Sequence, residues 1–363
     1  MAESEYKAVD ATDASLPAPR RVRGTLKPPR ITDVARSAGV SPITVSRVFN
    51  QPQTVAPETL ERVREAVQKL GYVPNRLAGG LSSARSRLIA AIVPTIVHSL
   101  FSETIQAFSE AMSAAGYQVL LALSGYDDQN EEQLLDAVMS RRPEGVLLTG
   151  VAHTDSLRQR LSVLDLLIVE TWDITDAPID MLIGFSHHQV GEAVARRFLQ
   201  RGVHRPALVS ANDERAMARR GGFRETLAAE GISEIREVIV DPPSSVAIGK
   251  EAYRRLRDQD AAIDAIFCGS DLVALGVLRE AKAAGVAIPE SLAICGFGDL
   301  EFAAETEPRL STVHVDGRRI GAMAARALLD RLQAESAADG ATRLTATPLC
   351  ADVGFALIDR DTI

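Results

Sequence analysis

Residues 31–50 read ITDVARSAGVSPITVSRVFN, and this stretch predicts two short helices joined by a tight turn. Thr32 is expected to cap the first helix, because its hydroxyl can accept a hydrogen bond from a free backbone N–H group. Gly39 follows the last apolar residues of that helix and favours the left-handed conformation that ends helices. Ser41 then caps a second helix with Pro42 at its first position, where a missing N–H costs nothing. This order of elements is the helix-turn-helix pattern of DNA-binding proteins.

A third helix is expected over residues 57–70, where apolar residues recur at helical spacing. The inner face of the second helix is expected to consist of three apolar residues, Val45, Val48 and Phe49. We therefore expect a three-helix DNA-binding domain over residues 29–74. A disordered tail rich in Ala, Pro, Ser and Asp is expected before it, over residues 1–28.

The first residues of the second helix, which include Ser41, are expected to reach base edges in the major groove. Arg47 can bond a guanine edge through two N–H groups, whereas Thr44 and Ser46 suit phosphates better. Pro42 and Ile43 have no side-chain donor and can read a base only by apolar contact, for example with a thymine methyl. A helical bundle with another purpose is the alternative that the helix pattern alone leaves open.

The distribution of charge favours nucleic acid as a partner of the head. The chain has 363 residues, 40 Lys+Arg, 48 Asp+Glu and a net charge of −8. Residues 1–86 carry 13 basic and 8 acidic residues, a net of +5, so residues 87–363 carry a net of −13. A basic head on an acidic body predicts one polyanion-binding module and a second unit with another role.

Several classes of protein are disfavoured by what the sequence lacks. No run approaches the ~20 apolar residues of a membrane helix, and the first residues have no apolar signal core. Cys268, Cys295 and Cys350 are too few and too widely spaced for a disulfide framework or a CxxC metal site. We therefore expect a cytoplasmic protein without a membrane partner.

Catalysis is not expected. The glycine-containing stretch at residues 296–299 lacks the third glycine of a dinucleotide-binding turn, and no GxSxG elbow is present. His187 and His188 have no further His or Cys at metal-ligand spacing. We expect no enzyme activity, no cofactor and no metal.

From Ser86 onward, apolar strand-like runs alternate with amphipathic helices. Nine strands are expected, at residues 88–93, 118–123, 145–149, 166–170, 181–185, 206–210, 236–240, 264–268 and 292–296. Helices are expected between them, for example at residues 101–115, 129–141, 189–201, 217–230, 246–259 and 271–284. This α/β alternation predicts parallel sheets covered on both faces, arranged as two doubly wound subdomains.

The stretch 31–50, followed by GYVPNRLA at 71–78, resembles the head of the LacI/GalR (lactose-repressor) family of bacterial transcription regulators. The resemblance continues to about residue 357. It is closest to the gluconate-operon repressors in three stretches, GYQVLLALSGY at 116–126, VETWD at 169–173 and EPRLS at 307–311. It adds to the predicted DNA-binding set Thr32, Asn50, Tyr72 and Asn75. It also implies a core that resembles the periplasmic binding proteins.

The resemblance implies a hinge and linker over residues 75–86, in which residues 75–83 match the family segment that becomes helical only on operator DNA. Leu81 matches the family's leucine that opens a base step in the minor groove, and Ala78 lies one helical turn before it. Such an apolar wedge offsets its unstacking cost by bending DNA onto more protein. Gly79 and Gly80 agree with a segment that is helical only when bound, since each costs about 1 kcal/mol in a helix. A linker leucine packed on the core is the alternative reading of Leu81.

The core over residues 87–363 is expected to bind an effector and to form a dimer. The resemblance places one subdomain at about 87–184 and 313–344 and the other at about 185–312 and 345–363, with chain crossings near Gly184, Thr312 and Thr345. Ligands of such sheets bind beyond the carboxyl ends of the strands. Nine residues there are the predicted effector-binding set, His98, Phe101, Glu170, Trp172, Asp173, Arg219, Ser270, Asp271 and Asp299.

Arg219 aligns with the family's effector-binding arginine, and its guanidinium fits a carboxylate through two hydrogen bonds. Glu170 aligns with an acidic ligand-binding position. Ser270 and Gly298 replace an Asn and an Asp of many relatives, and Asp271 can instead have a structural role. His98 and Trp172 are equally compatible with an ordinary loop histidine and a packing aromatic. The loop 241–246 has no aromatic residue to stack on a sugar ring, which favours an open-chain sugar acid such as gluconate.

The sequence thus predicts a homodimeric repressor, in the cytoplasm and at the nucleoid when bound to DNA. Two-fold symmetry of the protein implies a near-palindromic operator. Binding of the effector between the core subdomains is expected to release the operator. A regulator of the same family that responds to a neutral sugar, and a transport protein that binds sugars, are the alternatives.

Overall fold

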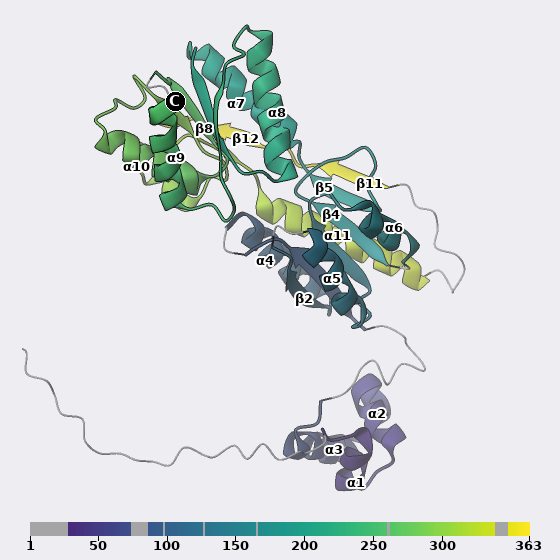
Figure 1. The fold of residues 1–363 in the computed structure, drawn as a ribbon. Coiled ribbons are helices and arrows are strands. Elements are labelled where there is room, and N and C mark those ends of the chain that lie inside the picture. Colours follow the sequence, from purple (N-terminus) through teal and green to yellow (C-terminus); the bar gives the residue numbers. More distant parts are fainter. Residues whose placement is uncertain are drawn as a thin grey trace, which may run out of the picture. The chain divides into compact units, whose positions relative to one another are not determined.

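The computed structural model describes residues 28–73, 86–96, 99–125, 128–164, 166–259, 262–337 and 348–363. The chain forms two compact units, Met1–Ala84 and Arg85–Ile363, here called the head and the core (Figure 1). Several predictions concern positions outside the described residues, namely the tail before residue 28, the hinge up to residue 85, Asn75, Ala78, Leu81, His98 and the crossing near Thr345. No helix within the described ranges has the length and apolarity of a transmembrane helix.

The head has the predicted helix-turn-helix. Its elements are α1 (Ile31–Ala38), α2 (Pro42–Asn50), the short helix η1 (Pro52–Thr54) and α3 (Pro57–Leu70). Gly39 ends α1 with φ of 66°, a left-handed conformation that glycine adopts without strain. The hydroxyl of Ser41 accepts a hydrogen bond from the backbone N–H of Thr44 at 3.1 Å, as expected of a helix cap.

Two details of the head differ from the predictions. Thr32 does not cap α1, which begins one residue earlier; the backbone N–H of Arg30 instead donates to the carboxylate of Asp33 at 2.9 Å. Phe49 is not part of the inner face of α2, because 39% of it is exposed. The buried core of the head consists of Val34, Ala35, Ala38, Val45, Val48, Val63 and Ala66.

The core contains two parallel sheets, and all nine predicted strands are present with bounds within one residue of those expected. The larger sheet has the order β11-β5-β4-β3-β1-β2 and the smaller sheet the order β7-β6-β8-β9. The strands of the larger sheet are β1 (Leu88–Val93), β2 (Gln118–Leu123), β3 (Gly145–Thr149), β4 (Leu167–Thr171), β5 (Met181–Gly184) and β11 (Leu349–Asp352). Those of the smaller sheet are β6 (Pro206–Ser210), β7 (Arg236–Ile239), β8 (Ala265–Cys268) and β9 (Ala293–Cys295). The fold class predicted from the sequence is confirmed.

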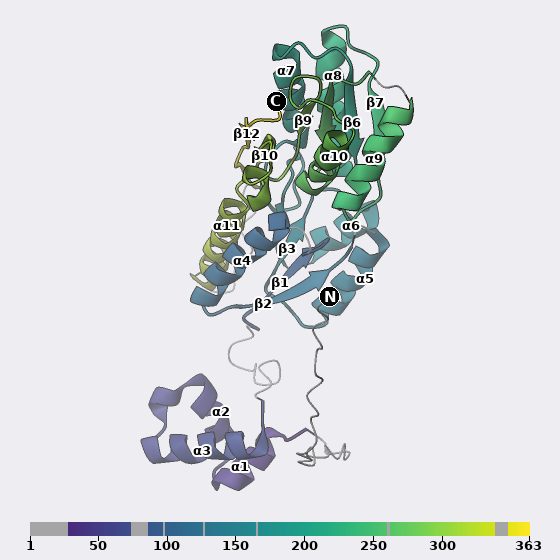
Figure 2. The ribbon, with the colours of Figure 1, turned by 90° about the vertical axis from the view of Figure 1, so that its left-hand side faces the viewer.

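Helices cover both faces of each sheet (Figure 2). On the larger sheet, α4 (Ser99–Ala114) and α11 (Gly317–Ala337) pack on one face, and α5 (Asp128–Met139) and α6 (Asp155–Val163) on the other. On the smaller sheet, α7 (His187–Gln200) and α8 (Glu214–Ala229) pack on one face, and α9 (Val246–Gln259) and α10 (Asp271–Ala283) on the other. The short helix η2 (Glu301–Ala304) follows β9. Apolar residues face both ways along the strands, as expected for doubly covered parallel sheets.

Helices α7 and α8 begin two and three residues before their predicted starts. The side chain of Ser186 accepts a hydrogen bond from the N–H of Gln189 at 3.2 Å, and that of Asp213 accepts one from Ala216 at 3.1 Å. These caps place His187 and Arg215 in the first helical turns rather than in the preceding loops. Both residues therefore have fixed backbones.

The C-terminal part of the core differs from the prediction. Residues 345–363 were expected in the second subdomain, but β11 pairs with β5 at the edge of the larger sheet. Only afterwards does β12 (Ala356–Ile358) pair with β10 (Thr312–His314), in a small antiparallel sheet. From α11 through β11 the chain thus stays with the first subdomain, and it crosses to the second only after Asp352.

Candidate DNA interface and ligand pocket

The start of α2 forms an exposed surface on the head. Ile43 is 67% exposed, and Ser41, Pro42 and Arg47 are also exposed. The hydroxyl groups of Ser41 and Thr44 lie 2.9 Å apart, so each restrains the other. This surface combines an apolar tip with a cationic group one turn along, the pattern expected of a helix that reads base edges.

The remaining predicted DNA-binding residues that the structure describes lie further along α2, on α1 and just after α3. The side-chain amide of Asn50 donates to the hydroxyl of Ser46 at 3.2 Å at the end of α2. Thr32 is exposed on α1. Tyr72 instead packs on the core of the head, with its ring centroid 6.3 Å from that of Phe49. Tyr72 therefore contributes packing at the point where the described head ends.

A pocket in the core is lined by residues from both subdomains. Phe101 of α4 and Trp172, which follows β4, come from the first subdomain. The other lining residues come from the second subdomain, His187, Ala211, Asp213, Arg215, Arg219, Pro242, Ser244, Gly269, Ser270 and Phe297. Four of the nine predicted effector-binding residues, Phe101, Trp172, Arg219 and Ser270, thus meet at one pocket.

Arg219 is the central cation of this pocket. It is only 8% exposed, and its guanidinium carbon lies 4.3 Å from the ring centroid of Phe297. Burial lowers the pKa of Arg219 to about 10, assisted by the charge of Arg215 and opposed by Asp213 and Asp173. The side chain thus stays charged at neutral pH. Among the described residues, no carboxylate forms an ion pair with its guanidinium.

His187 holds Arg219 in place. Nη1 of Arg219 donates to Nδ1 of His187 at 2.8 Å, and Nε2 of His187 donates to the backbone oxygen of Trp172, also at 2.8 Å. Burial, and then the charges of Arg219 and Arg215, lower the pKa of His187 well below its ordinary value. The imidazole is therefore neutral, with its proton on Nε2. The sequence pattern presents His187 only as a possible metal ligand and does not reveal its contact with Arg219.

Arg215 is a second cation that was missed in the sequence. It lies one turn before Arg219 on α8, so the two side chains share a helix face. Its guanidinium carbon lies 5.3 Å from the ring centroid of Phe101, and its Nε lies 3.7 Å from a carboxylate oxygen of Asp213. Its Nη1 is buried without a hydrogen-bond partner among the described residues. Arg215 could have been predicted from the sequence, because it precedes Arg219 by four residues and so shares its helix face.

Glu170 lies outside this pocket. It is fully buried, and one carboxylate oxygen accepts a hydrogen bond from the backbone N–H of Ile179 at 2.7 Å. The other oxygen lies 3.5 Å from Nε2 of His153 and 3.9 Å from Nη1 of Arg158. Residues alternate between the two faces of β4, and Glu170 shares the α6 face with Ile168. In the structure, Glu170 therefore pairs with His153 and Arg158 inside the first subdomain.

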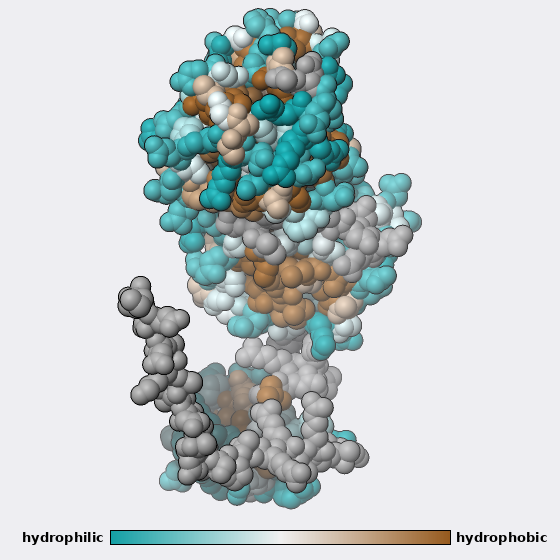
Figure 3. Space-filling model, turned by 60° about the vertical axis from the view of Figure 1, so that its left-hand side comes forward, coloured by the Kyte–Doolittle hydropathy of each residue, from teal (hydrophilic) through white to brown (hydrophobic). Residues whose placement is uncertain are grey.

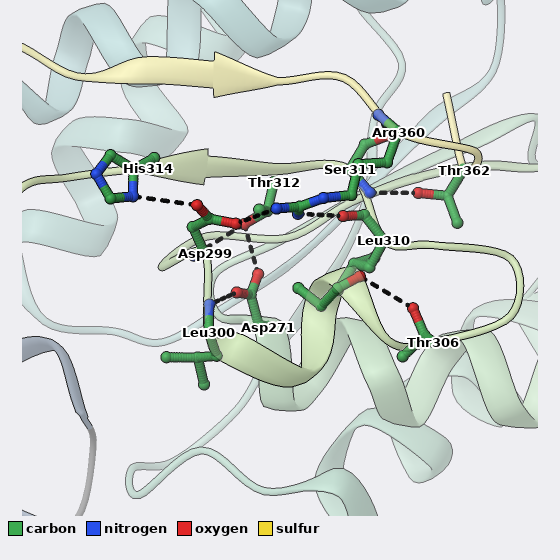
Figure 4. A network of polar contacts seen from close by, with 11 residues as sticks. Asp271, Asp299, Leu300, Thr306, Leu310, Ser311, Thr312, His314, Arg360 and Thr362 are labelled. Atoms are coloured by element: carbon green, nitrogen blue, oxygen red, sulfur yellow. Dashed lines mark hydrogen bonds and ion pairs between the residues drawn. The ribbon is translucent and has the colours of Figure 1, made fainter.

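Asp271 and Asp299 also lie away from the pocket, in a polar network beside β10 (Figure 4). The carboxylate of Asp271 accepts hydrogen bonds from the hydroxyl of Thr312 and the backbone N–H of Leu300. Burial raises the pKa of Asp271 to about 6, against the effect of these bonds. Asp299 accepts a hydrogen bond from Arg360 at 2.6 Å and lies 3.1 Å from Nδ1 of His314.

Asp173 lines a hollow that adjoins the pocket. The two share Asp213 and Arg215, and the hollow also includes Ser124, Glu131 and Asn212. Burial raises the pKa of Asp173 to about 6, opposed by a hydrogen bond from Ile174 and by the charges of Arg215 and Arg219. The predicted residue is thus near the pocket but does not line it.

Known sequences and structures match both units of the chain. The family profile described as bacterial regulatory proteins, lacI family, matches residues 30–75, and that of the periplasmic binding protein-like domain matches residues 195–350. The HTH-type transcriptional regulator GntR of Pseudomonas aeruginosa is 36% identical over 335 residues, which cover 92% of this chain and 95% of that protein. GntR of Escherichia coli strain K12 is 30% identical over 332 residues, covering 91% and 97%.

Two solved structures show the same arrangement of elements. A LacI-family regulator from Silicibacter pomeroyi superposes with a TM-score of 0.82 at 28% identity, covering 92% of this chain and 99% of that one. The transcription regulator GntR from Chromobacterium violaceum has a TM-score of 0.68 at 36% identity, covering 76% of this chain and 98% of that one.

Proposed function

Because the chain belongs to the LacI family of bacterial regulatory proteins, we propose that it is a homodimeric repressor controlled by a sugar acid such as gluconate. It is a DNA-binding transcription regulator and not an enzyme. We place DNA reading in residues 29–74, the hinge in residues 75–86 and effector binding in residues 87–363. The protein acts in the cytoplasm, at the nucleoid while it is bound to DNA.

The pair of arginines in the pocket carries the proposal of an acidic effector. Arg219 is a buried cation held by a neutral histidine and an aromatic ring, and Nη1 of Arg215 is buried without a partner among the described residues. A buried charge or donor without a partner lowers stability, so this arrangement favours a ligand that supplies the missing oxyanion. A carboxylate fits the guanidinium groups through charge-assisted hydrogen bonds.

The rest of the pocket suits hydroxyl groups. Ser244, Ser270 and Asp213 contribute polar atoms to its wall, while Trp172 and Phe297 supply apolar faces for carbon atoms. An open-chain sugar acid has a carboxylate at one end and hydroxyl groups along the rest. The three stretches that resemble gluconate-operon repressors agree with gluconate as this acid.

A second copy of the chain is the proposed occupant of the exposed edge of the larger sheet. Leu121 and Leu123 on β2 are 39% and 46% exposed, and Ile96 after β1 is 46% exposed. Figure 3 shows an apolar patch on the subdomain that holds this strand. Apolar edge strands are normally covered in soluble proteins, and a two-fold contact covers both copies at once. The dimer in turn requires a near-palindromic operator.

The hinge proposal rests on the family resemblance alone. Leu81 of each protomer enters the minor groove as an apolar wedge, together with Ala78, when the operator is bound. Leu81→Ala should therefore weaken specific binding much more than non-specific binding. Equal losses on both kinds of DNA contradict the wedge.

A thermal-shift screen of the full chain tests the effector. Gluconate should raise the melting temperature, while glucose and cellobiose at the same concentration should not. In a gel-shift titration, gluconate should then weaken operator binding. Stabilisation by neutral sugars alone contradicts the acidic-effector proposal and favours the neutral-sugar alternative.

A further inference from the structure

Two runs of buried hydrogen bonds, joined through the covalent frame of Trp172, lead away from the ligand pocket. The first run begins with Arg219 and His187, described above, and reaches the backbone oxygen of Trp172. The indole N–H of Trp172 donates to the hydroxyl of Thr104 at 3.0 Å, and that hydroxyl donates to the backbone oxygen of Gly317 at 2.9 Å. Arg219, His187, Trp172 and Thr104 are each at most 8% exposed.

The chemistry of these groups permits one arrangement of protons. Guanidinium and indole N–H groups only donate, and backbone oxygens only accept. His187 must therefore accept at Nδ1 and donate from Nε2, and Thr104 must accept from Trp172 and donate to Gly317. Loss of any one bond leaves a buried donor or acceptor without a partner, so the groups cannot rearrange independently.

This relay connects the two subdomains. His187 and Arg219 lie on α7 and α8, which pack on the smaller sheet, whereas Trp172 follows β4 of the larger sheet. The bond from His187 to Trp172 makes the crossing. Trp172 has φ of 69°, a left-handed conformation that is strained for an aromatic residue. Such a conformation persists only while the surrounding contacts hold it.

The far end of the relay lies in the contact between α4 and α11. Gly317 is the first residue of α11. One turn further along α11, a Cβ atom added at Gly321 would lie 2.2 Å from the backbone oxygen of Thr104. The two backbones are thus in direct contact at Thr104, and a shift of this residue must move α11 as well.

We propose that this relay couples ligand binding at Arg219 to the packing of α4 against α11, with His187 and Thr104 as positioning residues. The proposal rests on the proposed function, because the signal it carries is release of operator DNA. An oxyanion bound by Arg219 redirects its N–H groups and weakens the bond to His187. The weaker bond alters the contact of His187 with Trp172, and through it the hydrogen bond between Trp172 and Thr104.

Thr104→Val tests the relay, because valine keeps the shape of threonine and removes its hydroxyl. Thr104 does not line the pocket, so the affinity of the free protein for gluconate should stay within about twofold of wild type. The ratio of operator dissociation constants with and without gluconate should fall at least fivefold, since allosteric couplings are typically about 5–150-fold. Thr104→Ser keeps both hydrogen bonds and should retain the wild-type ratio. A wild-type ratio in Thr104→Val overturns the relay.

A double-mutant cycle without any ligand separates this proposal from that of the effector. Arg219→Met removes the first donor of the relay, and its effect on operator affinity should differ at least about threefold between the wild-type and the Thr104→Val backgrounds. Additive effects overturn the relay whether or not gluconate binds. If gluconate does not change operator binding by the wild-type protein but the mutant effects are non-additive, gluconate is not the effector and the relay is supported. If Arg219→Met does not fold, His187→Leu replaces it in the cycle.

Discussion

The hydroxyl of Thr312 lies 2.5 Å from a carboxylate oxygen of Asp271, and neither residue is accessible to solvent. The second oxygen of Asp271 accepts the N–H of Leu300 at 2.7 Å. This aspartate thus joins the start of α10 to the chain crossing at β10. At this position the family resemblance implies a ligand contact, and the geometry supports a structural one.

Asp271→Ala should destabilise the core by about 2–4 kcal/mol, because it leaves a buried hydroxyl and a buried N–H without an acceptor. Urea unfolding followed by circular dichroism measures this loss. Asp241→Ala, in the loop before α9, should change the unfolding free energy by less than about 0.5 kcal/mol. Equal stability of both variants would show that Asp271 is not a structural residue.

Arg47→Ala should weaken binding to the operator by roughly ten- to hundredfold, the contribution of a guanidinium that reads a base edge. Arg62→Ala on α3 removes an exposed cation from the same unit and serves as the control. Fluorescence anisotropy on operator and on unrelated DNA separates the two roles. If Arg47→Ala lowers the affinity for operator and for unrelated DNA by the same factor, Arg47 contacts phosphate only.

Arg219→Met should lower the affinity for gluconate at least about tenfold, because it removes the charged donors of the pocket. Arg220→Met is the matched control, since the neighbouring arginine faces Glu237 at 4.0 Å rather than the pocket. Isothermal titration calorimetry of both variants compares the two positions. Similar losses in both variants would argue against a direct role of Arg219.

The free energy of unfolding should fall as pH rises from about 6.5 to 9. Burial lowers the pKa of His153, but the hydrogen bond with Glu131 and the nearby charges of Glu131 and Glu170 outweigh it and raise the pKa to about 9. Because this folded-state pKa is above the ordinary value, the stabilising charge is complete below pH 6.5 and is lost through pH 9. The contribution is on the order of 3 kcal/mol. His153→Gln should flatten this part of a pH series of urea unfolding; an unchanged slope would assign it to other groups.

Leu121→Glu should dissociate the proposed dimer, because it places a charge in the apolar patch of both copies. Val163→Glu is the control, since Val163 is 78% exposed on α6 and lies away from β2. Sedimentation velocity at micromolar concentration should show monomers for the first variant and dimers for the second. A dimer that survives Leu121→Glu must use another surface.

The two sheets could be predicted well because their strands are continuous apolar runs, whose burial on both faces needs no knowledge of their neighbours. The strands β10, β11 and β12 were not predicted, since β10 has Val313 as its single apolar residue and β11 and β12 are mostly exposed or only partly buried. Their positions depend on partners far away in the chain. Local patterns cannot supply such partners.

Only part of the pocket could be predicted for the same reason. Alignment identified Arg219, but the face of β4 that Glu170 occupies depends on the pairing of β4 in the sheet. The role of His187 depends on the tertiary structure. The cap at Ser186 and the chain crossing between the subdomains place His187 between Arg219 and Trp172. Residue type and spacing do not encode these contacts between subdomains.

The place of β11 at the edge of the larger sheet sets an order of events during synthesis. Strand β5 is made roughly 165 residues before the partner that covers its outer edge, a delay of about 10–30 s at usual elongation rates. During that interval the whole smaller sheet emerges, while β5 exposes unpaired backbone groups that other chains can extend. The nascent first subdomain is thus the stage at which chaperones would protect this protein from aggregation.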